Sequence, residues 1–125
     1  MNNIFIRGLN MGCGLQVKKF TKEEFKTLSK NGETIDIADA KGGVMVLDLY
    51  KHCDLLLCFL AILKNADQYQ YVRFTPKQLA NIIALVKNGT DWSWPEVKDS
   101  DMDALIDLLN DTDFSESVLT FCFDV

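Results

Sequence analysis

The sequence has few of the features that mark secreted, membrane-spanning or metal-binding chains. Its longest apolar run, Leu55 to Leu63, has nine residues, whereas crossing a bilayer takes roughly 20, so we expect no membrane association. The N-terminus lacks a basic start followed by a long apolar stretch, so we expect no export signal and a cytoplasmic location. No two of the four cysteines are spaced as Cys-x-x-Cys. We therefore expect reduced thiols in a reducing compartment.

Residues for catalysis are equally scarce. His52 is the only histidine, and on a helix its neighbour Cys53 would point about 100° away from it. One alternative remains a thiol-dependent enzyme that uses Cys53 or Cys13 with His52. The glycines fit no phosphate-binding loop, and a single histidine with scattered cysteines lacks the spacing of a zinc site. We predict a protein that is not an enzyme and that has no cofactor, no metal and no catalytic residue.

The patterns that are present predict one α+β domain spanning residues 1–125. Thr21 with Glu24, and Thr75 with Gln78, have the spacing of capping boxes and mark two helix starts. Both chain ends read as strands, which favours a mainly antiparallel sheet with about four helices packed on it. We expect strands over 3–9, 15–20, 34–38, 44–47, 69–74 and 117–125. We expect helices over 21–31, 48–64 and 75–88, and a last one that starts at 100.

Charge is distributed unevenly along the chain. The net charge is −5, but residues 91–125 carry one basic and ten acidic side chains, a balance of −9 that the first 90 residues offset by only +4. Such an acidic surface repels nucleic acid and membranes and steers a basic partner toward it. We therefore expect a basic protein partner and no direct binding to nucleic acid. The oligomeric state stays open.

Two tryptophans precede this acidic segment, in a loop that Pro95 keeps out of the helical conformation. Tryptophan is enriched at interface hot spots. In the last helix, Met102, Leu105, Ile106 and Leu109 are expected to form the apolar face, opposite the aspartates. The predicted partner-binding surface consists of Trp92, Trp94, Glu96, Asp99, Asp101, Asp103, Asp107 and Asp111.

These features favour a small bacterial or phage-encoded immunity or inhibitor protein, which neutralises a basic toxin or nuclease by stoichiometric binding. Carboxylates would pair with Lys or Arg on the partner. A second alternative is a phage anti-defence protein that mimics nucleic acid, with carboxylates in place of phosphates. The basic character of residues 1–30 and 64–90, +4 and +3, counts against it.

The order of features resembles the YfbM-like bacterial domain family of unknown function. The resemblance is carried by "GLQVKKFTKEEF" near the start, "LDLYKHCDLLLCFLAIL" in the centre, "YVRFTPKQLANIIALV" later and "VLTFCFDV" at the end. It implies a small bacterial α+β domain and transfers no catalytic residue.

Overall fold

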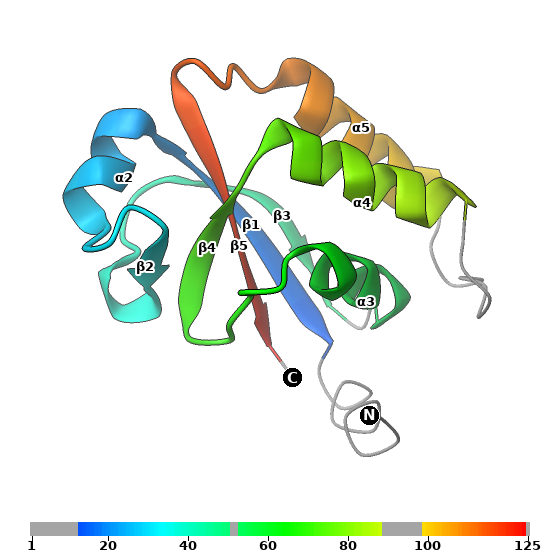
Figure 1. The fold of residues 1–125 in the computed structure, drawn as a ribbon, viewed down its shortest axis with the longest axis horizontal. Helices are drawn as coiled ribbons and strands as arrows, with labels where there is room; N and C mark the ends of the chain where they lie inside the picture. The colour runs from blue at the N-terminus through cyan, green and yellow to red at the C-terminus, as the bar shows by residue number, and fades with distance from the viewer. Residues whose placement is uncertain (1–12, 51–52, 89–98, 125) are drawn as a thin grey trace.

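A computed structural model describes residues 13–50, 53–88 and 99–124 of the chain (Figure 1). Its elements in chain order are β1 (Gly14–Thr21), α2 (Lys22–Leu28), β2 (Thr34–Asp36), the 3-10 helix η1 (Ile37–Asp39), β3 (Val44–Leu49), α3 (Cys53–Ile62), β4 (Gln70–Phe74), α4 (Pro76–Asn88), α5 (Asp99–Asp111) and β5 (Ser117–Asp124).

The five strands form one antiparallel sheet in the order β2-β4-β5-β1-β3. The C-terminal strand β5 lies in the middle, where it pairs with β1 over eight residue pairs and with β4 on its other side. The predicted α+β class with a mainly antiparallel sheet is therefore confirmed. The strand expected over residues 3–9 lies outside the described residues.

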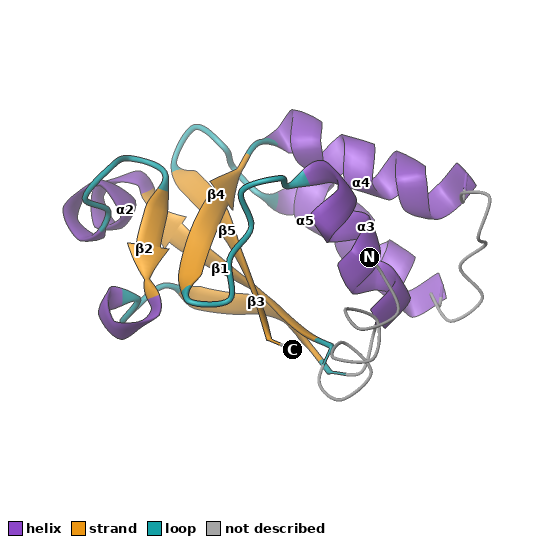
Figure 2. Ribbon diagram, turned by 60° about the horizontal axis from the view of Figure 1, so that its bottom comes forward, coloured by secondary structure: helices purple, strands orange, loops and turns teal. Residues whose placement is uncertain are grey.

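Alternation along β5 divides the core between the two faces of the sheet. Leu119, Phe121 and Phe123 face α3, α4 and α5, as the sequence pattern predicts. The Phe59 ring of α3 stacks on Phe121 with 4.8 Å between the ring centroids. The larger part of the core therefore lies between the sheet and these three helices, which Figure 2 shows together on one side of the sheet.

The opposite face of the sheet carries a smaller core. Phe25 of α2 packs there against Phe20, Ile35 and Tyr71, and Figure 2 shows α2 on the side of the sheet away from α3–α5. This core lies toward the end of β1 that leads into α2. The other end of the same face carries a hollow that includes Gln16.

Both predicted capping boxes are formed. The Thr21 hydroxyl accepts a bond from the Glu24 N–H at 3.0 Å, and the Glu24 carboxylate accepts one from the Thr21 N–H at 2.9 Å. Thr75 and Gln78 exchange the same two bonds at 3.1 and 2.8 Å. Local hydrogen bonds thus set where α2 and α4 begin.

Three predicted boundaries are wrong. The central helix was expected from residue 48, but Asp48 and Leu49 belong to β3 and α3 begins only at Cys53. Pairing with β1, in which Leu49 lies opposite Leu15, holds this segment extended. The strand expected over 34–38 ends at 36, where η1 begins, and the helix expected to reach 31 ends at 28.

Candidate functional site

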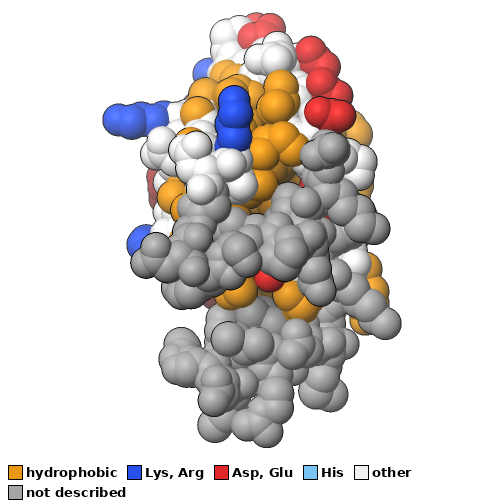
Figure 3. All heavy atoms as spheres, turned by 90° about the vertical axis from the view of Figure 1, so that its right-hand side faces the viewer, with side chains coloured by type: hydrophobic (Ala, Val, Ile, Leu, Met, Phe, Trp, Pro, Cys, Tyr) orange, Lys and Arg blue, Asp and Glu red, His pale blue; other side chains and the backbone are white. Residues whose placement is uncertain are grey.

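The exposed face of α5 combines carboxylates with one apolar side chain. The helix packs on the core through Leu105, which is fully buried. Beyond its first turn, the helix exposes five side chains, and we call them the α5 face: Asp103, Ile106, Asp107, Asn110 and Asp111. Figure 3 views this end of the molecule, with a run of acidic side chains along its upper right edge next to hydrophobic surface.

Two residues of α5 lie on the side opposite to the one predicted. Asp101 is only 6% exposed, because it precedes the buried Leu105 by one helical turn and shares its packed side. It therefore does not belong to the exposed surface for which it was predicted. Ile106, expected in the core, is 37% exposed and lies between Asp103 and Asp107. The helical period places 103, 106, 107, 110 and 111 on one side of the helix, but only the packing of Leu105 on the core makes that side the exposed one.

The turn that follows α5 uses a further carboxylate for structure. Asp113 accepts bonds from the Ser115 N–H at 3.0 Å and the Ser115 hydroxyl at 2.5 Å. These bonds, the hydroxyl first, lower the pKa of Asp113 below its ordinary value. Asp113 therefore fixes the turn into β5, whereas the side chains of Asp103, Asp107 and Asp111 are exposed on the helix.

The structure brings together only part of the predicted binding surface. Asp103, Asp107 and Asp111 share one side of α5. Trp92, Trp94 and Glu96 lie outside the described residues, as does the side chain of Asp99, which begins the helix. Their contribution to the surface stays a prediction.

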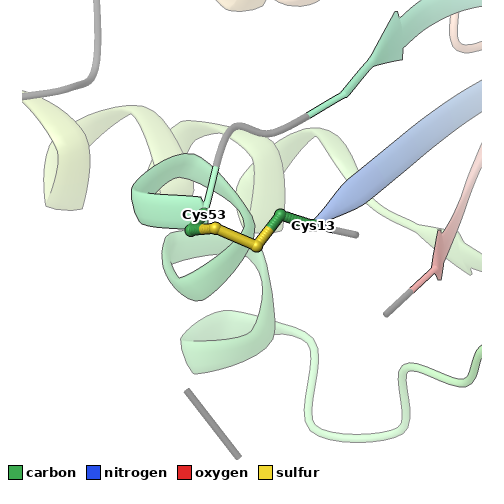
Figure 4. Close-up of a disulfide and its surroundings, with 2 residues drawn as sticks. All are labelled: Cys13 and Cys53. Carbon is green, nitrogen blue, oxygen red and sulfur yellow. A yellow bond between two sulfur atoms is a disulfide. The ribbon is translucent and has the colours of Figure 1, made fainter. Parts of the chain in front are cut away.

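Two of the four cysteines form a disulfide, so the expectation of four reduced thiols is wrong. Cys13, just before β1, is bonded to Cys53 in the first turn of α3, with 5.0 Å between their Cα atoms (Figure 4). The bridge joins residues 40 apart in the sequence. The spacing of the cysteines gave no sign of it, because only the packing of α3 beside the start of β1 brings the two together.

The bridge also bears on the thiol-enzyme alternative. A thiol nucleophile acts as a thiolate, and in this oxidised form neither Cys13 nor Cys53 carries one. The proposed partner His52 lies outside the described residues. Cys58 and Cys122 remain buried thiols. Burial, with a smaller contribution from Asp54, raises the pKa of Cys58 to about 12, which leaves it unreactive.

Within 13–50, 53–88 and 99–124, no three His, Cys, Asp or Glu side chains lie close enough together to hold a metal ion. None of the helices described in the structure has the length and apolar character needed to span a bilayer.

Comparison with known proteins adds no identity to these observations. The resemblance to the YfbM-like family therefore stays a prediction. No protein family model, no curated protein and no solved structure matches this chain.

Proposed function

We propose that this protein binds a basic protein partner stoichiometrically and docks it on the α5 face. The observation that carries the proposal is the exposure of three carboxylates one helical turn apart, on a helix that contains no Lys or Arg. We call Asp103, Asp107 and Asp111 the acidic stripe. Basic side chains elsewhere on the helix would neutralise its charge, but α5 has none.

The acidic stripe lowers the stability of the helix itself. Like charges four residues apart destabilise a helix by about 0.2–0.5 kcal/mol per pair. Asp111 also stands at the C-terminal end, where the helix dipole disfavours a carboxylate and the last turn has no basic residue. A surface that only needed to be soluble could avoid this cost by alternating the signs of its charges. The arrangement therefore favours a role for the charge in binding.

Ile106 supplies apolar contact area, which the carboxylates lack. Exposed charge pairs contribute mainly to the rate of association and little to affinity. An apolar side chain between them can be buried against a partner and so contribute to affinity. The α5 face thus combines steering by charge with a small apolar anchor.

The finer form of the proposal is an immunity or inhibitor protein that covers the basic active site of a toxin or nuclease. Asp103, Asp107 and Asp111 would pair with Lys or Arg of that site. Trp92 and Trp94, which precede α5 in the sequence, are proposed as the aromatic anchors of the interface with that partner. This role requires no chemistry from the chain itself.

The disulfide changes the expected place of action. Disulfides persist in oxidising compartments and are rare in the cytosol of mesophiles. The Cys13–Cys53 bond therefore favours a site of action outside the reducing cytosol, against the cytoplasmic location that the sequence favoured.

The test uses the immobilised protein to capture partners from an extract of the source organism at low salt. A basic protein that elutes as the salt is raised is the expected result, because screening weakens charge pairing between exposed groups. The double variant Asp103→Lys, Asp107→Lys should reduce its capture at least about tenfold, since like charges across an interface are strongly unfavourable.

A matched control carries the same change of charge elsewhere. Glu23 and Glu33 are exposed and lie outside α5, so the variant Glu23→Lys, Glu33→Lys should capture the partner as the unchanged protein does. If the two double variants lose the partner equally, net charge and not the α5 face controls binding. If neither loses it, the docking surface lies elsewhere.

A further inference from the structure

The face of the sheet opposite α5 carries a second site. A hollow of about 300 Å³ opens there, at the end of β1 farther from α2. Its volume is near the lower limit of the sites that hold small molecules, roughly 300 Å³. Its lining includes Gln16, Ile37, Asp48 and Tyr50.

The register of three paired strands brings together the side chains that form the polar floor of the hollow. Gln16 of β1 has Asp48 of β3 as its partner on one side and Cys122 of β5 on the other. Directly paired residues point to the same face of a sheet. The three side chains therefore stand in one row across three strands, although 32 residues separate Gln16 from Asp48.

Two successive hydrogen bonds orient the Gln16 side chain in this row. The Tyr71 hydroxyl donates to the Gln16 side-chain oxygen at 2.7 Å, so the amide nitrogen of Gln16 is turned toward Asp48, at 3.4 Å from its Oδ1. Burial, and to a lesser extent Cys122 and Asp48, raises the pKa of Tyr71 above its ordinary value, which keeps the hydroxyl protonated as a donor.

The carboxylate of Asp48 retains most of its capacity to accept hydrogen bonds. A separation of 3.4 Å is at the long limit for an N–H···O bond, and a carboxylate offers about four acceptor positions. Among the described residues, none of the side chains that line the hollow is basic. Lys18, on the same face, donates instead to the backbone oxygens of Ala40 and Gly42, at 2.7 and 3.2 Å.

Apolar side chains flank this charge. Ile37 is 48% exposed and Tyr50 is 61% exposed, and both line the hollow. An exposed aromatic ring beside a carboxylate attracts a cation through its π face as well as through the charge. The hollow therefore offers a negative floor and an apolar rim to the same ligand.

We propose that this hollow binds a small organic cation, with an amidinium, guanidinium or ammonium group on Asp48 and a flat apolar body against Ile37 and Tyr50. The Gln16 amide, held by Tyr71, limits the position that the charged group can take. This site is independent of the α5 face and lies on the other side of the sheet.

Benzamidine is a suitable probe, because it joins a planar cation to an aromatic ring. Titration of the isotope-labelled full chain, followed by NMR chemical shifts, should show saturable binding in the millimolar range, with shifts centred on Gln16, Asp48 and Tyr50. Benzamide has the same shape without the charge and should bind at least about tenfold more weakly, since charge-assisted hydrogen bonds are the stronger ones.

Two variants and a control separate the contribution of the Asp48 charge from that of the Tyr50 ring. Asp48→Asn keeps the shape of an exposed side chain and should weaken benzamidine at least about tenfold, while Tyr50→Ala should weaken it several-fold. Asp107→Asn, on the α5 face, should leave the affinity unchanged. Folding of each variant is read from the dispersion of the same spectra.

Three results would overturn the proposal. These are shifts that do not saturate or that lie outside the hollow, equal binding of benzamidine and benzamide, and unchanged affinity in the folded Asp48→Asn variant. Loss of the basic partner from the α5 face would not affect any of these measurements, so the two proposals fail separately.

Discussion

Reduction of the Cys13–Cys53 disulfide is expected to lower the free energy of unfolding by about 4 kcal/mol. The bond closes a loop between residues 40 apart in the sequence. In the chain-entropy treatment, a loop of this length removes about 13 cal/mol/K of entropy from the unfolded chain, which corresponds to about 4 kcal/mol at room temperature. In a domain of 125 residues, this should lower the melting temperature by roughly 10–15 °C.

The assay is urea unfolding followed by circular dichroism, with and without a phosphine reductant. The double variant Cys13→Ala, Cys53→Ala is the control, and its midpoint should not respond to the reductant. Cys13 has a positive φ of 54°, and alanine keeps the cost of that conformation because it too carries a Cβ. The side chain of Cys13 is only 1% exposed, so the variant also loses some packing, and reduction of the unchanged chain gives the cleaner value.

Two results would refute this reasoning. The first is an unfolding midpoint of the unchanged chain that does not respond to the reductant. The second is a thiol titration of the unfolded, unreduced protein that finds four thiols, where only those of Cys58 and Cys122 are expected.

Three further predictions test the packing. Gly43→Ala should destabilise the protein by about 1–3 kcal/mol more than Gly32→Ala in urea unfolding, and equal losses would contradict this. Both glycines have positive φ, but an added Cβ would lie 2.7 Å from the Phe20 ring at Gly43 and would meet nothing within 4 Å at Gly32. Phe59→Ala should cost about 3–5 kcal/mol, since its ring is fully buried, and a loss below about 1 kcal/mol would place it outside the core. Cys58, whose pKa burial raises to about 12, should react with a thiol reagent at mildly alkaline pH only after unfolding, and rapid labelling of the native protein would count against this.

Features that depend on neighbouring residues could be predicted from the sequence. The starts of α2 and α4 follow from capping boxes, in which residues three apart satisfy each other's backbone groups. The two faces of β5 follow from alternation, because successive side chains of a strand point to opposite faces. Antiparallel pairing of a sheet with covering helices followed from the order of these elements.

Only the tertiary structure decided the features that join distant residues. Asp48 and Leu49 are extended because β1 pairs with them, whereas the local pattern favoured a helix. The partner of Cys13 depends on where α3 packs, and no spacing rule identifies it. Local propensities are weak compared with such pairing and packing, so they are overridden where the two conflict.

Some features of the two candidate sites likewise follow from the sequence, and others only from the tertiary structure. The −9 balance of residues 91–125 is a property of the sequence, and so is the placing of the exposed aspartates on one helix. That Asp101 is buried and Ile106 exposed depends on which side of α5 meets the core. The row of Gln16, Asp48 and Cys122 exists only because three strands pair in one register, and register is set by contacts across the sheet and not along the chain.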